Sequence, residues 1–329
     1  MKKKTFICIV PEVLSRSFDQ YANQQKWNYH IVKFNYIKTA YYLSKLLKWK
    51  WLIKFSLQLG FNKALKRSFN IDKTKNEGVL LVIAGIKLNR KNVNVLKTSN
   101  LFKILWYTDS SLRGGGIKKQ EGLFDEVWYH DGGDFENSNH ISKKWIPYGF
   151  NSSIYYCGEN QVKDIDVLFT GYLKLPQYQT RLEYLELLMN SDLMHKYKIV
   201  AAVTTQDPSL IKRIENSGIT YTGRLAEDDY ASYIKRAKVV VNILQDDGVK
   251  PINPLFFAIP YAGGIQIINK RSYLNDWLQS GVHFYETEPP NLITLIYDIL
   301  NNQISLDIKS AKSETQKFSF QHLLKLYFF

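Results

Sequence analysis

The chain has 329 residues and a formal net charge of +14, and 45% of its residues are hydrophobic and 22% charged. This length suits two domains, and the composition is that of a globular protein rather than a disordered one. No segment reaches the roughly 18 apolar residues of a membrane-spanning helix. The two cysteines, Cys8 and Cys157, give no disulfide framework, so we expect a cytoplasmic protein.

The first part of the chain alternates short apolar runs with longer segments of mixed polarity. The run at 6–10 follows a basic start, but Pro11 ends it too early for a signal peptide, so we interpret it as a strand. Alternating strand and helix signals predict an α/β sheet. The predicted strands cover 5–10, 30–34, 79–84, 103–107, 126–129 and 144–146.

A basic, aromatic segment lies within this part. From Gln20 to Ile71 there are ten basic residues and no acidic one, and the stretch 41–61 adds two tryptophans and two phenylalanines. Lysines beside interfacial aromatics suit an anionic membrane surface, so we expect membrane contact through 33–67. An ordinary basic surface is an equal alternative. Binding of nucleic acid is the third and weakest reading.

A second series of strands and helices follows the turn-rich passage 146–156, which predicts a domain boundary. Two Rossmann-like, doubly wound domains facing a cleft are therefore expected, at 1–157 and 158–310, with a C-terminal helix in 311–329. In the helix at 207–218, Asp207 is the predicted N-cap and Gly218 the stop. The other predicted strands are 165–172, 196–203, 219–223, 238–244, 265–268 and 283–286, and the other helices 180–191, 228–237, 271–279, 290–300 and 313–329.

Catalytic candidates follow two strands of the first series. Asp109 stands just after the strand at 103–107, where a carboxylate can act as general base on an acceptor hydroxyl. His130 and Asp131 follow the strand at 126–129 and are the second choice for this base. For all three, a side chain that only caps a turn is the alternative.

Donor-binding candidates follow the strands of the second series, because ligands of open α/β sheets bind at the carboxyl ends of strands. Gly171 would let a phosphate approach the main chain, and Arg181 in the next helix could reach it; a tight turn and a solvated arginine are the alternatives. Gly263 and Gly264 either offer N–H groups to a diphosphate or only stop a helix. The remaining candidates are Gly223 and Arg224 in one loop, and Gln245, Asp246, Asp247 and Lys250 in another.

Several kinds of site have no motif in the sequence. Metal-ligand spacings such as H-x-x-x-H and C-x-x-C are missing, and so are a P-loop and a dinucleotide fingerprint. The pattern therefore favours group transfer from a phosphate-bearing donor, with no cofactor and no tightly bound metal.

Over roughly 104–270 the sequence resembles the GT-B glycosyltransferases, in particular the CgeB-like, spore-maturation-type group. The resembling passages are ILWYTDSS, FDEVWYHD, WIPYGFNSSIYY, DIDVLFTGYL, YTGRLAEDDYASYIKRAKVVVNIL and NPLFFAIPYAGGIQIIN. The resemblance implies an acceptor domain, then a domain that holds a nucleotide-sugar, and a last helix that crosses back to the first domain. This sequence departs from the group at residues 255–259, which read LFFAI. Members of the group have an Arg and a Glu there, and the Glu binds the ribose of the donor.

The function expected from this resemblance is transfer of a sugar from a UDP- or GDP-type donor to a glycan or lipid-linked acceptor. Such an enzyme would serve bacterial-type surface polysaccharide synthesis, in the cytoplasm or peripherally on the inner face of the membrane. The missing acidic pair favours inversion and leaves ribose recognition to Asp246, Asp247 or Lys250. A non-catalytic GT-B-like protein that binds a glycan or nucleotide is the alternative.

Overall fold

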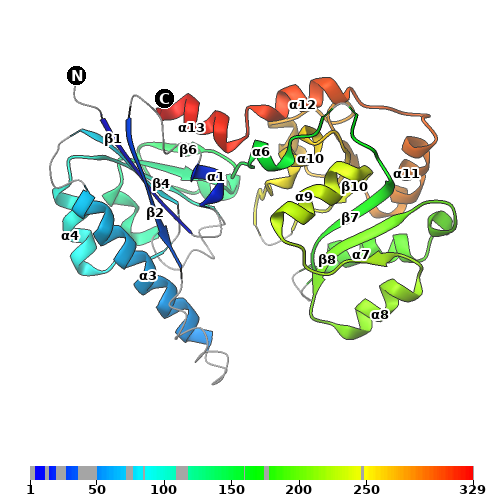
Figure 1. The fold of residues 1–329 in the computed structure, drawn as a ribbon, viewed down its shortest axis with the longest axis horizontal. Coiled ribbons are helices and arrows are strands. Elements are labelled where there is room, and N and C mark those ends of the chain that lie inside the picture. The colour runs from blue at the N-terminus through cyan, green and yellow to red at the C-terminus, as the bar shows by residue number, and fades with distance from the viewer. Residues whose placement is uncertain are drawn as a thin grey trace. The chain divides into compact units, whose positions relative to one another are not determined.

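A computed structural model describes residues 4–11, 15–19, 27–35, 50–71, 77–83, 86–108, 118–158, 160–173, 178–245 and 248–328. The chain divides into two compact units, Met1–Tyr148 and Gly149–Phe328, each built on one parallel sheet (Figure 1). The division lies inside the passage 146–156 that predicted a boundary. Among the described helices, none is both long and apolar enough to cross a bilayer.

The first unit is a six-stranded parallel sheet in the order β2-β1-β3-β4-β5-β6. Its strands are β1 (Lys4–Pro11), β2 (Trp27–Phe34), β3 (Gly78–Ile83), β4 (Phe102–Trp106), β5 (Glu126–Tyr129) and β6 (Lys143–Trp145). Strands that are covered on both faces read as continuous apolar runs. In β1, the five residues 6–10 are fully buried, which confirms the predicted strand.

Helices connect these strands. They are α1 (Arg16–Asp19), α3 (Lys50–Ile71), α4 (Arg90–Thr98), the 3₁₀ helix η2 (Lys118–Leu123) and α5 (Gly132–Glu136). α3 packs Phe61 and Leu65 into the core of the unit. It also contacts α4, because Asn92 donates from Nδ2 to the side-chain oxygen of Asn62 at 2.7 Å.

The second unit is another six-stranded parallel sheet, in the order β12-β11-β10-β7-β8-β9. Its strands are β7 (Ile165–Leu173), β8 (Ile199–Thr205), β9 (Thr220–Tyr221), β10 (Ala237–Asn242), β11 (Ile265–Asn269) and β12 (Tyr285–Thr287). Its helices are α6 (Ser152–Tyr155), α7 (Gln179–Met189), η3 (Asp192–His195), α8 (Pro208–Asn216), α9 (Glu227–Arg236), α10 (Leu255–Tyr261), η4 (Ser272–Asp276), η5 (Pro289–Asn291), α11 (Leu292–Leu300), α12 (Ile308–Gln316) and α13 (Phe320–Phe328). Two parallel sheets with covering helices confirm the predicted α/β class.

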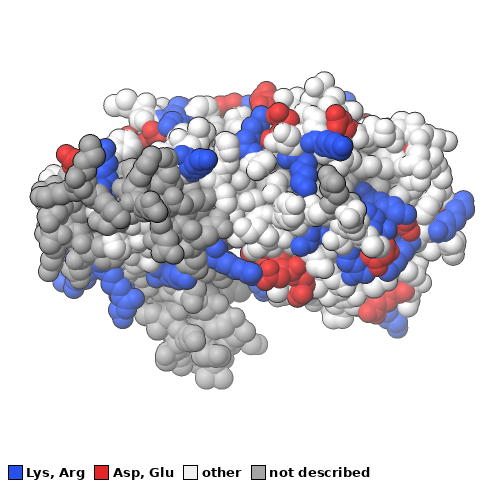
Figure 2. Space-filling model, turned by 45° about the horizontal axis from the view of Figure 1, so that its top comes forward, with Lys and Arg blue, Asp and Glu red and all other residues white. Residues whose placement is uncertain are grey.

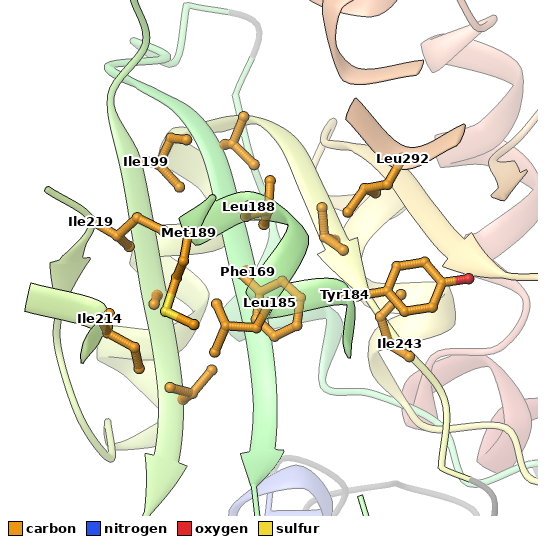
Figure 3. Close-up of a cluster of buried hydrophobic side chains, with 14 of the residues drawn as sticks. Phe169, Tyr184, Leu185, Leu188, Met189, Ile199, Ile214, Ile219, Ile243 and Leu292 are labelled. Atoms are coloured by element: carbon orange, nitrogen blue, oxygen red, sulfur yellow. The ribbon is translucent and has the colours of Figure 1, made fainter. Parts of the chain in front are cut away.

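The core of the second unit lies between this sheet and α7 (Figure 3). Leu185 and Leu188 of α7 lie over Phe169 of β7, and all three side chains are fully buried. The helical spacing of the apolar residues in 180–191 predicts this face. Tyr184, on the same helix, donates its hydroxyl hydrogen to the carbonyl oxygen of Thr287 at 2.8 Å and so ties α7 to the end of β12.

Two predicted helices have a different form in the structure. The segment 271–279 contains only the short 3₁₀ helix η4, and the tail is two helices, α12 and α13, rather than one. The tail breaks because the N–H of Phe320 donates to the carbonyl oxygen of Phe150 at 2.9 Å. This approach requires Gly149, since a Cβ there would come within 2.4 Å of the carbonyl oxygen of Phe318. The return of the last helix to the first unit stays a prediction.

Candidate functional site

The strand order of the second unit reverses between β7 and β10. β8 and β9 lie on one side of β7, whereas β10, β11 and β12 lie on the other. In open α/β sheets such a reversal opens a crevice at the carboxyl ends of the two strands, and ligands bind there. Thr170 is level with Asn242, so the crevice begins at Gly171 and Ile243. The fold therefore places a candidate donor site at this point.

Arg181 spans the crevice. Its Nε and Nη2 donate to the carbonyl oxygen of Ile243 at 3.0 and 2.5 Å, and its Nη1 donates to the carbonyl oxygen of Tyr172 at 2.7 Å. Only 4% of this residue is exposed, so the alternative of a solvated arginine is wrong. The guanidinium ties the two strand ends together, and its buried positive charge makes the potential at the crevice favourable to an anion.

Gly171 is required by the arginine. Its φ of +148° is a backbone conformation that side chains rarely adopt, and an added Cβ would lie 2.5 Å from Cδ of Arg181. Any other residue at this position would therefore push the guanidinium away from its carbonyl partners. The glycine thus makes room for the arginine side chain on one side, while it lines a pocket, and its contact with a phosphate stays a prediction.

A pocket of about 400 Å³ opens next to Gly171, at the carboxyl ends of β7, β8 and β9. Three of the predicted donor residues, Gly171, Gly223 and Arg224, line this one pocket, although 52 residues separate the first two in the chain. Gly223 has a φ of +69°, which turns the chain sharply out of β9. The other lining residues are Tyr172, Ala202, Thr204, Leu225, Glu227 and Tyr230.

Glu227 and Tyr230 also line this pocket and were not predicted from the sequence. Glu227 is the first residue of α9, and its carboxylate lines the pocket. Tyr230 lies one turn later, and burial raises its pKa to about 12, so that its phenol stays protonated at neutral pH and can donate a hydrogen bond. Their spacing of three residues at the start of a helix, directly after a strand, is the signal that could have identified them.

A group of three hydrogen-bonded amides, two buried and one half-buried, supports the loop after β10. Asn242 and Asn253 exchange two hydrogen bonds, of 3.1 and 2.8 Å, and Asn242 also donates to Oε1 of Gln266 at 3.0 Å. Oδ1 of Asn253 also accepts from the N–H of Phe256 in the first turn of α10. Of the predicted residues in this loop, Gln245 and Lys250 are half-buried, while Asp246 and Asp247 lie outside the described residues.

In the first unit, His130 lies at the carboxyl end of β5. The N–H of Tyr148 donates to Nδ1 of His130 at 2.9 Å, and the imidazole is buried. Since an amide N–H can only donate, Nδ1 must be the acceptor, and the neutral ring carries its proton on Nε2. With both nitrogens thus assigned, the neutral ring has no lone pair left for a substrate proton. His130 as the general base is therefore contradicted by the structure, and its Nε2–H is a hydrogen-bond donor.

Asp131 has a capping role. Its Oδ1 accepts from the N–H groups of Gly133 at 2.8 Å and Asp134 at 3.3 Å, so Asp131 is the N-cap of α5. Only 2% of the residue is exposed, and the cap is the alternative that the sequence left open. Asp109 lies outside the described residues and stays a prediction.

A metal site would need ligand side chains that converge among the residues that the structure describes. In that part of the chain, no group of three or more His, Cys, Asp and Glu side chains is placed to hold an ion. The carboxylates of Asp109, Asp246 and Asp247 lie outside it, so metal independence stays a prediction.

No family model and no curated protein sequence matches the chain. Solved structures do match it over nearly its whole length. A glycosyltransferase from Rickettsia africae is 12% identical with a TM-score of 0.63, and the match covers 99% of this chain and 97% of the other. Sucrose-phosphate synthase from Thermosynechococcus elongatus is 11% identical with a TM-score of 0.61, with 98% and 97% covered. Anabaena HepE, solved with UDP and glucose, is 11% identical with a TM-score of 0.60, with 97% and 95% covered.

The fold is GT-B. The predicted pair of Rossmann-like domains is thereby confirmed. Identities of this size establish the fold alone, and the narrower CgeB-like resemblance stays a prediction.

Within this GT-B fold, Gly263 and Gly264 stop a helix. The N–H of Gly263 donates to the carbonyl oxygen of Pro260 at 2.9 Å, and the N–H of Gly264 donates to that of Ile259 at 3.1 Å. Gly263, with a φ of +74°, is the left-handed residue of this stop. Both N–H groups are thus used inside the protein and are not presented to a diphosphate.

The register of the second sheet also separates the two glycines from the pocket. Ile265 is level with Val239, and Thr170 with Asn242. Gly264 therefore stands about five residues, or roughly 17 Å, from the level of Gly171 along the strand direction. A glycine that precedes a parallel strand lies at the amino edge, whereas the site lies at the carboxyl edge. The prediction that Gly263 and Gly264 bind the donor is wrong.

Proposed function

We propose that this protein is a glycosyltransferase that moves a sugar from a nucleotide-diphosphate sugar to an acceptor hydroxyl. The observation that carries the proposal is the pocket at the carboxyl ends of β7, β8 and β9, next to the point where the strand order reverses. Its volume of about 400 Å³ is in the range of small-molecule sites and suits a nucleoside with part of its diphosphate. HepE of Anabaena, which shares the fold, was solved with UDP and glucose, and this supports a UDP-type donor.

Cations supply the attraction for the diphosphate. Arg224 is exposed at the rim of the pocket and can move to pair with phosphate oxygens. The guanidinium of Arg181 is already bound to the main-chain carbonyl oxygens of Ile243 and Tyr172. Arg181 would therefore attract the diphosphate through its positive charge, without a direct contact, and would hold the ends of β7 and β10 in place. Lys250, half-buried in the loop after β10, is the third candidate for a phosphate contact.

The ribose has a new candidate partner. The sequence left ribose recognition to Asp246, Asp247 or Lys250, because 255–259 lacks an acidic residue. The carboxylate of Glu227 lines the pocket and can accept hydrogen bonds from ribose hydroxyls. We therefore propose that Glu227 binds the ribose of the donor nucleotide, and that the loop at 245–250 contacts its phosphates.

The reaction needs a base for the acceptor hydroxyl. We retain Asp109 for this role, because it follows Trp106, the last residue of β4, by three residues in the sequence, and ligands of parallel sheets bind where strands end. His130, whose Nδ1 accepts from the N–H of Tyr148, is not assigned a proton-transfer role. Metal-independent transfer with inversion of the anomeric centre is the form of the reaction that we favour.

The acceptor is proposed to be a glycan or a lipid-linked glycan, in bacterial-type surface polysaccharide synthesis on the inner face of the membrane. The basic, aromatic segment at 33–67 motivates this choice, since a lipid-linked acceptor brings the reaction to an anionic surface. The enzyme would then be cytoplasmic and peripheral.

One observation favours a second function, the binding of a glycan or nucleotide without catalysis. α10 lacks the Arg and Glu that the resembling group has, and all of its residues from Phe256 to Tyr261 are buried. Phe257 stacks on Phe318 with ring centroids 4.1 Å apart, so the helix serves the core of the unit. A protein that has lost its catalytic groups there would still bind a ligand in the pocket.

A binding assay followed by a turnover assay separates the two functions. The melting temperature is first measured with UDP, GDP, ADP and CDP, and the stabilising nucleotide is then supplied as its sugar with varied acceptors. A glycosyltransferase releases nucleoside diphosphate faster when an acceptor is present. A melting temperature that rises with nucleotide, with no release under any condition, would support the binding protein instead.

A further inference from the structure

The N-terminal half of α3 carries three large apolar side chains on its surface. Trp51, Phe55 and Leu59 are 59%, 51% and 42% exposed. They recur every four residues, so they lie on successive turns, and the rings of Trp51 and Phe55 are 6.4 Å apart. Single exposed apolar residues are common on proteins, but a row of three on one helix marks an interaction site.

This half of the helix extends beyond the carboxyl edge of its sheet. Gly60 lies directly against Asn35, which follows the last residue of β2: a Cβ on Gly60 would come within 2.0 Å of the carbonyl oxygen of Asn35. Residue 60 is therefore level with the end of the strand. Residues 50–59, which we call the α3 projection, reach past it by about 14 Å at 1.5 Å per residue. Figure 1 shows α3 continuing beyond the end of β2.

Basic side chains lie beside the base of the α3 projection. Lys87, Arg90 and Lys91 are exposed at the start of α4, and we call them the basic collar. They lie next to α3 because Gln58 donates to the carbonyl oxygen of Lys87 at 3.3 Å, and the N–H of Asn89 donates to Oδ1 of Asn62 at 3.0 Å. Figure 2 shows cationic side chains along this side of the molecule.

Acidic residues are missing from the same region of the sequence. Neither α3 nor α4 contains an Asp or Glu, and none occurs from Gly78 to Thr108. A second copy of the chain on this face would bring like charges together, which disfavours a dimer. Nucleic acid would satisfy the charges, but it would leave the apolar row exposed. An anionic lipid bilayer satisfies both, because phosphate head groups meet the collar while Trp51 and Phe55 enter the interface.

We propose that the α3 projection and the basic collar dock this protein on an anionic bilayer. The proposal deepens the proposed function by naming the surface that would meet a lipid-linked acceptor. The carboxyl edge of the first sheet holds His130 and the strand end that precedes Asp109. Docking through a projection at that edge brings the membrane to the acceptor side of the site.

The test is co-sedimentation of the full-length protein with vesicles of phosphatidylglycerol and phosphatidylcholine, compared with vesicles of phosphatidylcholine alone. We expect binding to the mixed vesicles at low salt and its loss at high salt. Changing Lys87, Arg90 and Lys91 together to Gln should lower the partition coefficient about 100-fold, since each cation contributes roughly fivefold. Trp51→Ser with Phe55→Ser should lower it at least about tenfold.

Matched controls come from other exposed positions. Lys212, Lys309 and Lys325 changed together to Gln remove the same charge from the second unit, and Ile141→Ser with Val162→Ser removes exposed apolar area elsewhere. Both controls should bind vesicles within about twofold of wild type.

The proposal is overturned if wild type does not sediment with the mixed vesicles, or if controls and test variants bind alike. It is also overturned if the same changes abolish a dimer or DNA binding but leave sedimentation with vesicles intact. Nucleotide binding and turnover on a soluble acceptor are measured separately, so loss of docking would not count against the glycosyl transfer.

Discussion

The side chain of Arg181 lies against Gly171: an added Cβ on the glycine would come within 2.5 Å of Cδ of the arginine. This contact joins the end of β7 to the carbonyl oxygen of Ile243 after β10, at the point where the strand order of the sheet reverses. The shape of the candidate donor site therefore depends on one glycine and one buried cation.

Gly171→Ala should lower both stability and nucleotide affinity. The new Cβ clashes with Arg181, and the φ of +148° disfavours any side chain. We expect a loss of about 2 to 4 kcal/mol in the free energy of unfolding, from overpacking and backbone strain together. Urea denaturation measures the loss. Gly158→Ala is the control, since an added Cβ there meets nothing within 4 Å. Equal stability of the two variants would contradict the described packing.

Arg224→Gln should weaken donor binding without unfolding the protein. Arg224 is exposed at the rim of the pocket, so its removal leaves the core unchanged. Loss of one charge-assisted contact to a phosphate should raise the dissociation constant of the nucleoside diphosphate about tenfold or more. Titration calorimetry measures it, with Lys212→Gln as the control, since Lys212 is exposed and does not line the pocket. An unchanged dissociation constant would remove Arg224 from the site.

Gly263→Ala separates a helix stop from a donor contact. The φ of +74° makes alanine unfavourable by about 1 kcal/mol or slightly more, although the nearest atom to the new Cβ is 3.9 Å away. We expect a lower midpoint of urea unfolding and an unchanged dissociation constant for the nucleotide. If the affinity falls while the stability stays the same, the two glycines belong to the donor site after all.

His130 and Asp109 should differ in their effect on the pH dependence of the rate. A general base must be deprotonated, so the rate rises as pH passes its pKa. Asp109→Asn should lower kcat by about 10² to 10⁴-fold and remove this rise. His130→Gln keeps a side-chain donor and should keep the rise, because Nδ1 already accepts from Tyr148. If His130→Gln loses the rise instead, the imidazole is the base.

Lys163→Met should stabilise the protein. Among the described residues, no group accepts a hydrogen bond from Nζ of Lys163, and burial lowers its pKa. A lysine whose folded pKa lies below its unfolded value binds fewer protons when folded, so wild-type stability rises with pH toward the ordinary lysine pKa of about 10.5. Replacing the amine by an apolar group should add about 1 kcal/mol at pH 7 and flatten this rise. Urea unfolding at pH 7 and pH 10 tests both effects, and a destabilised variant would contradict them.

Much of the fold follows from local sequence. The continuous apolar run at 6–10 predicts a strand covered on both faces, and these five residues of β1 are buried. Asp207 caps α8 through the N–H groups of Ser209 and Leu210, as its place before Pro208 predicts. These features depend on neighbours in the chain, which the sequence displays directly.

The site depends on partners that are distant in sequence, so less of it could be predicted. Gly171 and Arg224 follow strands of the second series, and the structure joins them in one pocket. The bonds of Arg181 to Ile243, 62 residues away, and of His130 to Tyr148, 18 residues away, have no local signal. The error at Gly263 has a different cause. Its place before a strand, rather than after one, already assigns it to the amino edge of a parallel sheet.

The most direct test of the donor site is a crystal structure of the protein with UDP. We predict the diphosphate beside Gly171 and Arg224, with the uridine between Gly223 and Glu227 at the carboxyl ends of β8 and β9. A nucleotide bound at the amino edge beside Gly263, or a pocket that stays empty at millimolar UDP while the nucleotide occupies another site, would contradict the account.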